Sequence, residues 1–294
     1  MKFEIPRKKG NKIGPLLWPD EYASCNGDRQ SPININLPAA LHLSKEYNLI
    51  FKRHNILPNR MLLKNTGRTV VVKAAWNNGK RPTIKGGILD GEYIFHEIHF
   101  HWGATNFEPS EHLINGYSFP LEMHLVHYKK KYETIKNAKD YNDGLAIVAY
   151  VFEAGDVDNP ILQNIIGNLP NIPTPSSSPV ELTPFKISKL APMFNKDFAT
   201  YQGSLTMPPC SEIVIWILYL KPLKASCDQV EQFRLIQDRH ENLIKRNFRP
   251  VQRLNGRKIL IDGQNEKPKD LEGCSKAIFR KASNLVCFLV TETE

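Results

Sequence analysis

Many short apolar runs, separated by glycine, proline and asparagine, recur along this chain. They are rich in β-branched and aromatic residues, which is typical of strands. The clearest predicted strands cover residues 61–64, 69–73, 93–101, 121–127, 145–152 and 212–220. Helical spacing is rarer and predicts helices over 161–167 and 226–245, the latter from Val230, Phe233, Ile236 and Leu243. Many strands with few interspersed helices favour a mainly β, α+β fold: a mostly antiparallel sheet with peripheral helices, not a doubly wound parallel one.

The ends of the chain differ in character from its middle. Residues 1–13 are polar and basic and predict a flexible arm. We expect a single domain over 14–265, which the extended segment Ser31-Pro32-Ile33-Asn34-Ile35 enters, and a polar extension over 266–294. The stretch PTPSSSP at 173–179 predicts a surface loop.

Composition narrows the classes of partner. The 294 residues are 41% hydrophobic and 23% charged, which allows an ordinary globular core. The formal charge of +9 is spread along the chain without a nucleic-acid motif, so we expect no nucleic-acid partner. The longest apolar run, 213–220, is too short to cross a bilayer as a helix, so we expect no transmembrane segment. The N-terminal residues hold charges but no apolar core of the kind that a signal peptide has.

The stretch FHEIHFHWG at 95–103 contains the first candidate chemistry. Because side chains alternate along a strand, His99 and His101 lie on one face. Two imidazoles on one face are two of the three protein ligands that a catalytic zinc site takes, with a fourth position left open. The alternative is a histidine-rich surface strand. A helical HExxH zinc protease is disfavoured because this stretch lacks the required i, i+4 histidine spacing.

The predicted strand over 121–127 offers a third ligand. Glu122, His124 and Val126 share one of its faces. Neighbouring strands lie about 4.8 Å apart, so His124 would complete a three-histidine set if this strand pairs with the first. Glu97 and Glu122 each stand two residues before a ligand on the same face, where they can accept from imidazole N–H groups.

Several motifs together resemble the α-class carbonic anhydrases between about Gly14 and Gly263. They are QSPINI at 30–35, IHFHWG at 98–103, SEH at 110–112, EMHLV at 122–126, YQGSLTMPP at 201–209 and FRPVQ at 248–252. The resemblance implies a twisted, mostly antiparallel ten-stranded sheet with zinc at the bottom of a cone-shaped cavity. It also implies a monomer that acts on a small-molecule substrate, with cis bonds before Pro32 and Pro209.

The resemblance implies reversible, Zn2+-dependent hydration of carbon dioxide to bicarbonate and a proton by zinc-bound hydroxide. His99, His101 and His124 would bind the zinc. Thr206 would accept a hydrogen bond from the hydroxide and donate one to Glu111. Asn255 is expected with Glu97 and Glu122 behind the ligands. The substrate pocket is expected to comprise Val126, Ile147, Leu205, Val214, Trp216 and Met207.

This chain departs from the family pattern at several positions. Glu97 stands where most members have glutamine. Arg68 occupies the position of the proton-shuttle histidine of fast members, and arginine does not release its proton near neutral pH. His96 belongs near the cavity rim by family position, but strand alternation would turn it away from Glu97. We therefore expect an active enzyme with limited proton export. The alternative is a catalytically weak or silent carbonic-anhydrase-like binding module.

The remaining histidines and the cysteines give further expectations. His112 and His127 are expected to be structural and buried, and His42, His54 and His240 to lie at the surface. Cys25 and Cys210 match the positions that form a disulfide in the secreted and membrane-bound branch, which implies an extracellular or secretory lineage. No signal peptide is seen, and the Trp-x-Tyr stretch that usually precedes Gly14-Pro15 is absent. A sequence incomplete at its N-terminus would account for both; the alternative is a cytoplasmic enzyme with two free thiols. No partner is evident for the other three cysteines: Cys227, Cys274 and Cys287.

Overall fold

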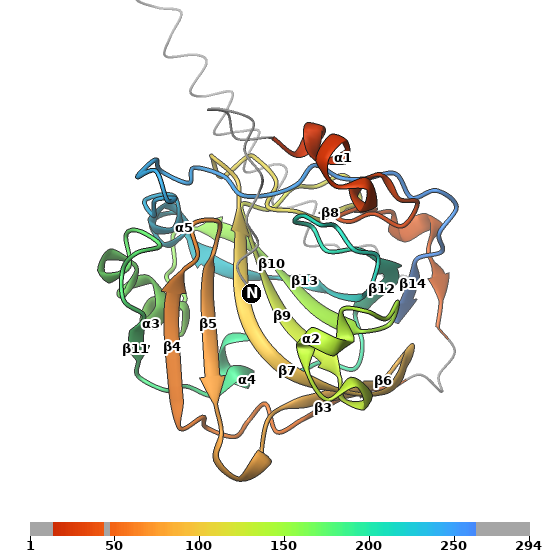
Figure 1. Ribbon diagram of the computed structural model, residues 1–294, viewed down its shortest axis with the longest axis horizontal. Helices are drawn as coiled ribbons and strands as arrows, with labels where there is room; N and C mark the ends of the chain where they lie inside the picture. Colours follow the sequence, from red (N-terminus) through yellow and green to blue (C-terminus); the bar gives the residue numbers. More distant parts are fainter. Residues whose placement is uncertain (1–13, 44–47, 263–294) are drawn as a thin grey trace, which may run out of the picture. The chain divides into compact units, whose positions relative to one another are not determined.

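A large mixed sheet dominates the computed structural model, which describes residues 14–43 and 48–262 (Figure 1). Over these residues the sheet has 12 strands. In chain order they are β2 (Leu41–His42), β3 (Leu49–Lys52), β4 (Arg60–Asn65), β5 (Val70–Ala75), β6 (Thr83–Gly86), β7 (Leu89–Trp102), β9 (Leu121–Lys129), β10 (Leu145–Gly155), β11 (Val180–Leu182), β12 (Phe198–Gly203), β13 (Val214–Ser226) and β14 (Leu260–Asp262). A separate two-stranded sheet pairs β1 (Asn34–Ile35) with β8 (Leu113–Ile114).

The main path of the sheet runs β11-β4-β5-β7-β9-β10-β13-β12-β14-β2, with β3 and β6 attached beside β7. Figure 1 shows β7, β9, β10 and β13 side by side at the centre. Most pairs are antiparallel, but β10 pairs with β13 and β14 with β2 in parallel. The predicted fold class is confirmed, with two refinements: the sheet is mixed, and the ten strands of the main path are joined by two more.

Helices in the described residues are short and peripheral. The α-helices are α1 (Trp18–Glu21), α2 (Ile135–Ala138), α3 (Leu162–Ile166), α4 (Ile187–Leu190) and α5 (Cys227–Phe233). The 3-10 helices are η1 (Pro15–Leu17), η2 (Ala23–Asn26), η3 (Leu37–Ala39), η4 (Asn77–Gly79), η5 (Lys130–Tyr132) and η6 (Leu169–Asn171). None of the helices in the described part of the chain is long and apolar enough to span a membrane.

The helix predicted over 226–245 is wrong beyond Phe233. A capping box of Ser226 and Gln229 starts α5, which ends at Phe233. Beyond it the Asp238 side chain accepts from the backbone N–H groups of His240 (2.7 Å) and Asn242 (3.1 Å). Such local side-chain bonds compete with helix formation. The other predicted helix, over 161–167, is confirmed as α3.

The two faces of the central strands differ in the kind of side chain that they carry. On β9 all nine residues are buried, but only Leu121, Met123 and Leu125 belong to the main hydrophobic core. Glu122, His124 and Val126 alternate with them and project to the opposite face. That face therefore holds buried polar groups over a rigid apolar support.

Several expectations concern residues outside the sheet or outside the described residues. The loop at 173–179 lacks strands and helices, and the extended entry buries Ile33 and Ile35. The bonds before Pro32 and Pro209 are cis. His54, expected at the surface, is only 2% exposed because it packs against the rings of Phe51 and His127. The arm at 1–13 and the extension at 266–294 lie outside the described residues.

Candidate metal centre and its surroundings

Three histidines meet on one face of two neighbouring strands. His99 and His101 project from β7, and His124 projects from β9, where it is the direct cross-strand partner of His99. His101 and His124 are fully buried, and His99 is 9% exposed. The pairing that the sequence left open is therefore present, and a surface-strand interpretation of these histidines is wrong.

Their ring nitrogens are spaced as ligands of one ion. One nitrogen from each ring lies within 4.8 Å of the other two, and His99 Nε2 is 3.1 Å from His124 Nδ1. Two nitrogens that bind one tetrahedral zinc ion at about 2.0–2.1 Å lie roughly 3.3 Å apart. His101 Nε2 is buried without any hydrogen-bond partner among the described residues. A buried lone pair of this kind is costly unless something binds it.

Groups behind the ligands hold two of the rings. His101 Nδ1 donates to the backbone carbonyl of Asn247 at 3.1 Å, which leaves Nε2 as the lone pair that faces the cluster. His124 Nε2 donates to Glu122 Oε1 at 2.7 Å, which leaves Nδ1 to face it. Burial lowers the pKa of His124 to about 4 and that of His101 well below its usual value, so both rings are neutral near pH 7. Neutral imidazole is the form that binds metal.

Two of the three predicted partners of the ligands lie near them. Glu122 contacts His124 as expected, and Glu97 Oε1 lies 3.8 Å from His99 Nδ1. Asn255 does not: its side-chain amide donates to the carbonyl of Asp28 at an exposed site. The asparagine that serves the cluster is Asn247, and it does so through its backbone carbonyl. A backbone acceptor has no residue-type signature, so the sequence did not point to Asn247, and the resemblance was carried over to Asn255 instead.

Glu122 also anchors a second, fully buried histidine. His112 donates to Glu122 through its backbone N–H (2.8 Å) and Nδ1 (2.7 Å). Its Nε2 lies 2.7 Å from the Tyr201 hydroxyl, which donates to the Ser31 hydroxyl. Burial would raise the pKa of Glu122, but His112 and His124 hold it far below its usual range. The expectation that His112 is structural is confirmed; sequence reasoning missed Tyr201 and Ser31 as its partners.

A second carboxylate lies on the other side of His101. Glu111 is 1% exposed, and its Oε1 is 3.5 Å from His101 Nδ1 and accepts from the backbone N–H of Arg249 at 2.9 Å. Burial and the Glu122 charge raise the pKa of Glu111 well above its usual value, although Thr206 and the Arg249 amide partly oppose them. Glu111 Oε2 makes no hydrogen bond of ordinary length and angle with the described residues. Thr206 is thus near enough to act on Glu111, and the hydrogen bond between them that the resemblance implies stays a prediction.

An apolar surface extends from the histidine cluster. Val126 pairs with Ile147, and Ile147 pairs with Trp216 on the next strand. Directly opposed residues share a face, so all three lie on the face of His124. The Trp216 ring centroid is 4.8 Å from that of His124. The other predicted pocket residues are Val214, two positions before Trp216, and Leu205 and Met207, on either side of Thr206.

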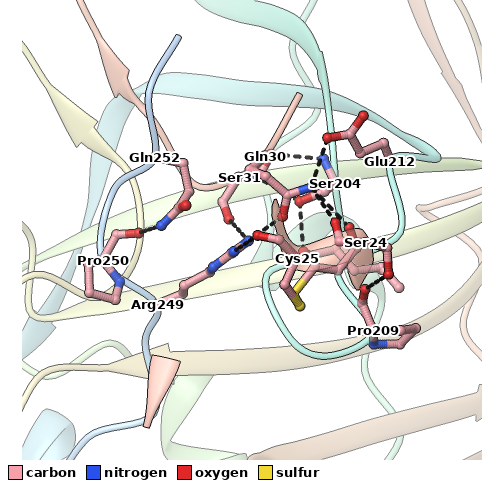
Figure 2. The surroundings of a disulfide bond; sticks show 12 residues. Ser24, Cys25, Gln30, Ser31, Ser204, Pro209, Glu212, Arg249, Pro250 and Gln252 are labelled. Atoms are coloured by element: carbon pink, nitrogen blue, oxygen red, sulfur yellow. Dashed lines mark hydrogen bonds between the residues drawn. A yellow bond between two sulfur atoms is a disulfide. The ribbon is translucent and has the colours of Figure 1, made fainter. Parts of the chain in front are cut away.

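The loop that carries Thr206 is tied to the N-terminal segment. Cys25 and Cys210 form the expected disulfide across 185 residues, and Figure 2 shows the polar groups around it. The Arg249 guanidinium donates to the carbonyls of Cys25 (3.0 Å) and Ser31 (3.0 Å). Because the Arg249 amide also holds Glu111, one residue connects the disulfide segment to the Glu111 carboxylate. Cys227 is free and exposed; Cys274 and Cys287 lie outside the described residues.

Arg68 lies close to this site. Its carbonyl accepts from the side-chain amide of Asn247 at 2.9 Å, the same residue that holds His101. Burial and the charge of Arg239 lower the pKa of Arg68, and Tyr22 opposes them. Arg68, at the family's shuttle position, is therefore a direct neighbour of Asn247, the residue whose carbonyl orients His101.

His96 does not lie where strand alternation places it. Its Nε2 is 3.4 Å from Glu97 Oε2, so the two consecutive side chains meet. The cause is a register shift between Phe95 and Glu97 in the pairing of β7 with β9. The expectation that His96 turns away from Glu97 is wrong.

Sequence comparison with known proteins shows the family to which this chain belongs. Residues 13–262 match the sequence model of the eukaryotic-type carbonic anhydrases. The chain is 35% identical to carbonic anhydrase 7 of Mus musculus over 85% of its own length and 94% of the relative. It is 34% identical to the mitochondrial carbonic anhydrase 5A of Rattus norvegicus over 86% and 83%, and 32% identical to carbonic anhydrase 15 of Mus musculus over 84% and 79%. The protein thus belongs to the eukaryotic-type carbonic anhydrases, the enzymes that hydrate carbon dioxide.

Proposed function

We propose that the three-histidine cluster binds Zn2+ and that the chain is a catalytically active carbonic anhydrase. The observation that carries the proposal is the convergence of His99 Nε2, His101 Nε2 and His124 Nδ1, with two rings oriented from behind. Bound zinc lowers the pKa of a water that it coordinates to about 7, as is established for carbonic anhydrases, and so makes hydroxide available to add to carbon dioxide. A silent binding module would have no need of a complete ligand set.

The residues around the cluster have separate tasks. Glu122 and the Asn247 carbonyl fix the tautomers of His124 and His101, which keeps a nitrogen lone pair aimed at the metal position. A positive charge at the cluster would also lower the pKa of the nearby Glu111 and favour its carboxylate form. Ionised Glu111 accepts a hydrogen bond from the Thr206 hydroxyl. The Thr206 oxygen is then left to accept a hydrogen bond from the attacking group and to orient its lone pairs.

The apolar surface suits an apolar substrate. Val126, Ile147 and Trp216 are 6%, 2% and 0% exposed and offer carbon dioxide no competing hydrogen bonds. Carbon dioxide gains nothing from polar neighbours, so an apolar wall beside the nucleophile favours its entry over that of water. We assign Val214, Leu205 and Met207 to the same surface.

Proton export is the step for which this chain lacks the usual group. Arg68 remains a cation near neutral pH even with its pKa lowered, and so does not accept a proton. We propose that small buffer molecules carry the proton from the site to bulk solvent.

The disulfide supports action in an oxidising compartment, and we propose an extracellular or secretory location on that ground. Family membership does not decide this, because a relative named as mitochondrial matches equally well. We expect the protein to act as a monomer.

Reconstitution tests the proposal. The purified chain is stripped of metal with a chelator, reloaded with Zn2+, and assayed for carbon dioxide hydration by stopped flow at each stage. We expect hydration to disappear on stripping and return on reloading, with inhibition by a primary sulfonamide. A zinc-loaded protein that hydrates carbon dioxide no faster than buffer would establish a silent module instead.

A further inference from the structure

A β-bulge in β7 changes which side chains surround His99. Phe95 pairs with His127, and Glu97 pairs with the neighbouring residue of β9, Val126. His96 is therefore the extra residue of the bulge and has no cross-strand partner in β9. Burial shows the effect: Phe95 and Ile98, three residues apart, both join the hydrophobic core, which regular alternation would not allow. His96 and Glu97 consequently share the face that carries His99. Bulges commonly re-aim side chains beside functional sites.

The re-aimed histidine reaches a carboxylate that faces a candidate ligand. His96 Nε2 is 3.4 Å from Glu97 Oε2, and Glu97 Oε1 is 3.8 Å from His99 Nδ1. The Glu97 carboxylate therefore lies between two imidazoles, one of which contributes its other nitrogen to the metal cluster. The His96 ring is itself packed against the Tyr128 ring at 6.4 Å.

Lys73 also lies near Glu97, but it is a weaker restraint on the carboxylate than His96. Lys73 Nζ lies 4.0 Å from Glu97 Oε2, and its side chain is 61% exposed, against 24% for His96. A flexible, exposed lysine at that distance contributes little. Burial lowers the pKa of His96 to about 4, so near neutral pH it is an uncharged ring with one N–H to donate. Burial would raise the pKa of Glu97, but the neighbouring His99, His96 and Lys73 side chains keep it lowered.

We propose that His96 is a positioning residue, which holds the Glu97 carboxylate against the His99 imidazole and so raises the zinc affinity of the site. This inference rests on the proposed zinc binding. Glutamate has freely rotating side-chain bonds, and restraining its carboxylate reduces the entropy lost when it orients a ligand ring. The expected dependence is specific: His96 acts only through Glu97.

The test is a double-mutant cycle read out as Zn2+ affinity, measured by competition with a chromophoric chelator. The four proteins are the parent, His96→Phe, Glu97→Ala and the double variant. We expect Glu97→Ala to weaken zinc binding about 10–100-fold. In the parent background, His96→Phe should weaken zinc binding about 3–10-fold, which is less than the effect of removing Glu97 itself. In the Glu97→Ala background, His96→Phe should have no further effect.

A rescue variant separates positioning from damage to the fold. His96→Gln keeps an N–H donor at the same distance along the side chain and should retain affinity close to the parent, whereas a merely structural role would not be rescued. Equal effects of His96→Phe in both backgrounds, or no effect in a parent that binds zinc, would overturn this inference alone. A parent that binds no zinc would overturn the proposed function and this inference with it.

Discussion

His54 Nε2 lies 3.4 Å from His127 Nε2, and both rings are buried. His127 Nδ1 donates to the Leu125 carbonyl at 3.0 Å, so its Nε2 accepts and His54 donates. Burial lowers the pKa of His54 to about 4, and burial with the neighbouring His54 lowers the pKa of His127 well below its usual value. The fold therefore depends on two neutral histidines that face each other.

This pair predicts acid sensitivity. Between about pH 6.5 and pH 4 the unfolded chain binds protons that folded His54 excludes, so the free energy of unfolding falls as the pH falls. The shift corresponds to about 3 kcal/mol for His54. Replacing His54 by Phe should flatten this part of the curve, measured by urea unfolding at a series of pH values. The variant with exposed His42 replaced by Ala is the matched control. If His54→Phe leaves the slope of the parent curve unchanged, the pair does not titrate in this way.

Replacement of Thr206 by Ala should lower kcat about 100-fold, because the attacking group loses the acceptor that orients it. Zinc affinity should stay near the parent value, since Thr206 is not one of the three residues of the histidine cluster. Stopped-flow hydration and chelator competition on the same preparation separate the two effects. Exposed Thr183→Ala is the control. Loss of zinc together with activity would assign Thr206 to the metal site itself.

Replacement of Arg68 by His should raise turnover in weak buffer, by roughly 10-fold or more if the imidazole reaches the site. The ratio kcat/KM should change little, because carbon dioxide and bicarbonate interconvert before the proton leaves. Turnover of the parent should climb with the concentration of imidazole-type buffers. A parent already insensitive to buffer, with no gain from Arg68→His, would reveal another internal proton acceptor.

The disulfide should contribute to stability. For a closed loop of this length the loop-entropy model gives about 5 kcal/mol, which is an upper estimate. Cys25→Ser/Cys210→Ser should therefore lower the Tm, whereas Cys227→Ser, at an exposed free thiol, should not. Peptide mapping of protein made in an oxidising compartment should find Cys25 and Cys210 joined. Recovery of Cys25 as a free thiol would contradict this.

Runs of β-branched and aromatic residues predicted the central strands best, because such side chains suit strands that are buried on both faces, as β9 is. Side chains still alternate between the two faces of such a strand. The ligand histidines follow from that alternation, and the third needed only the pairing of β7 with β9. Short strands such as β2, at the edge of the sheet, and β14 beside it were missed, since two or three residues carry no period.

What depends on the backbone could not be predicted from side-chain types. The bulge at His96 reverses the expected facing of that residue, and the Asn247 carbonyl replaces the expected Asn255. Tertiary contacts also override the helical spacing of apolar residues. Just beyond the end of α5, the backbone N–H of Gln237 donates to the Pro173 carbonyl at 2.7 Å.

Zinc content and carbon dioxide hydration, measured together on ligand variants, test the central claim most directly. The parent and the control His42→Ala should retain zinc and hydrate carbon dioxide. His99→Ala, His101→Ala and His124→Ala should each lose zinc affinity well beyond the roughly 10–100-fold cost of losing an outer partner, and lose hydration with it. Full-rate hydration by any one of these three variants would contradict the account.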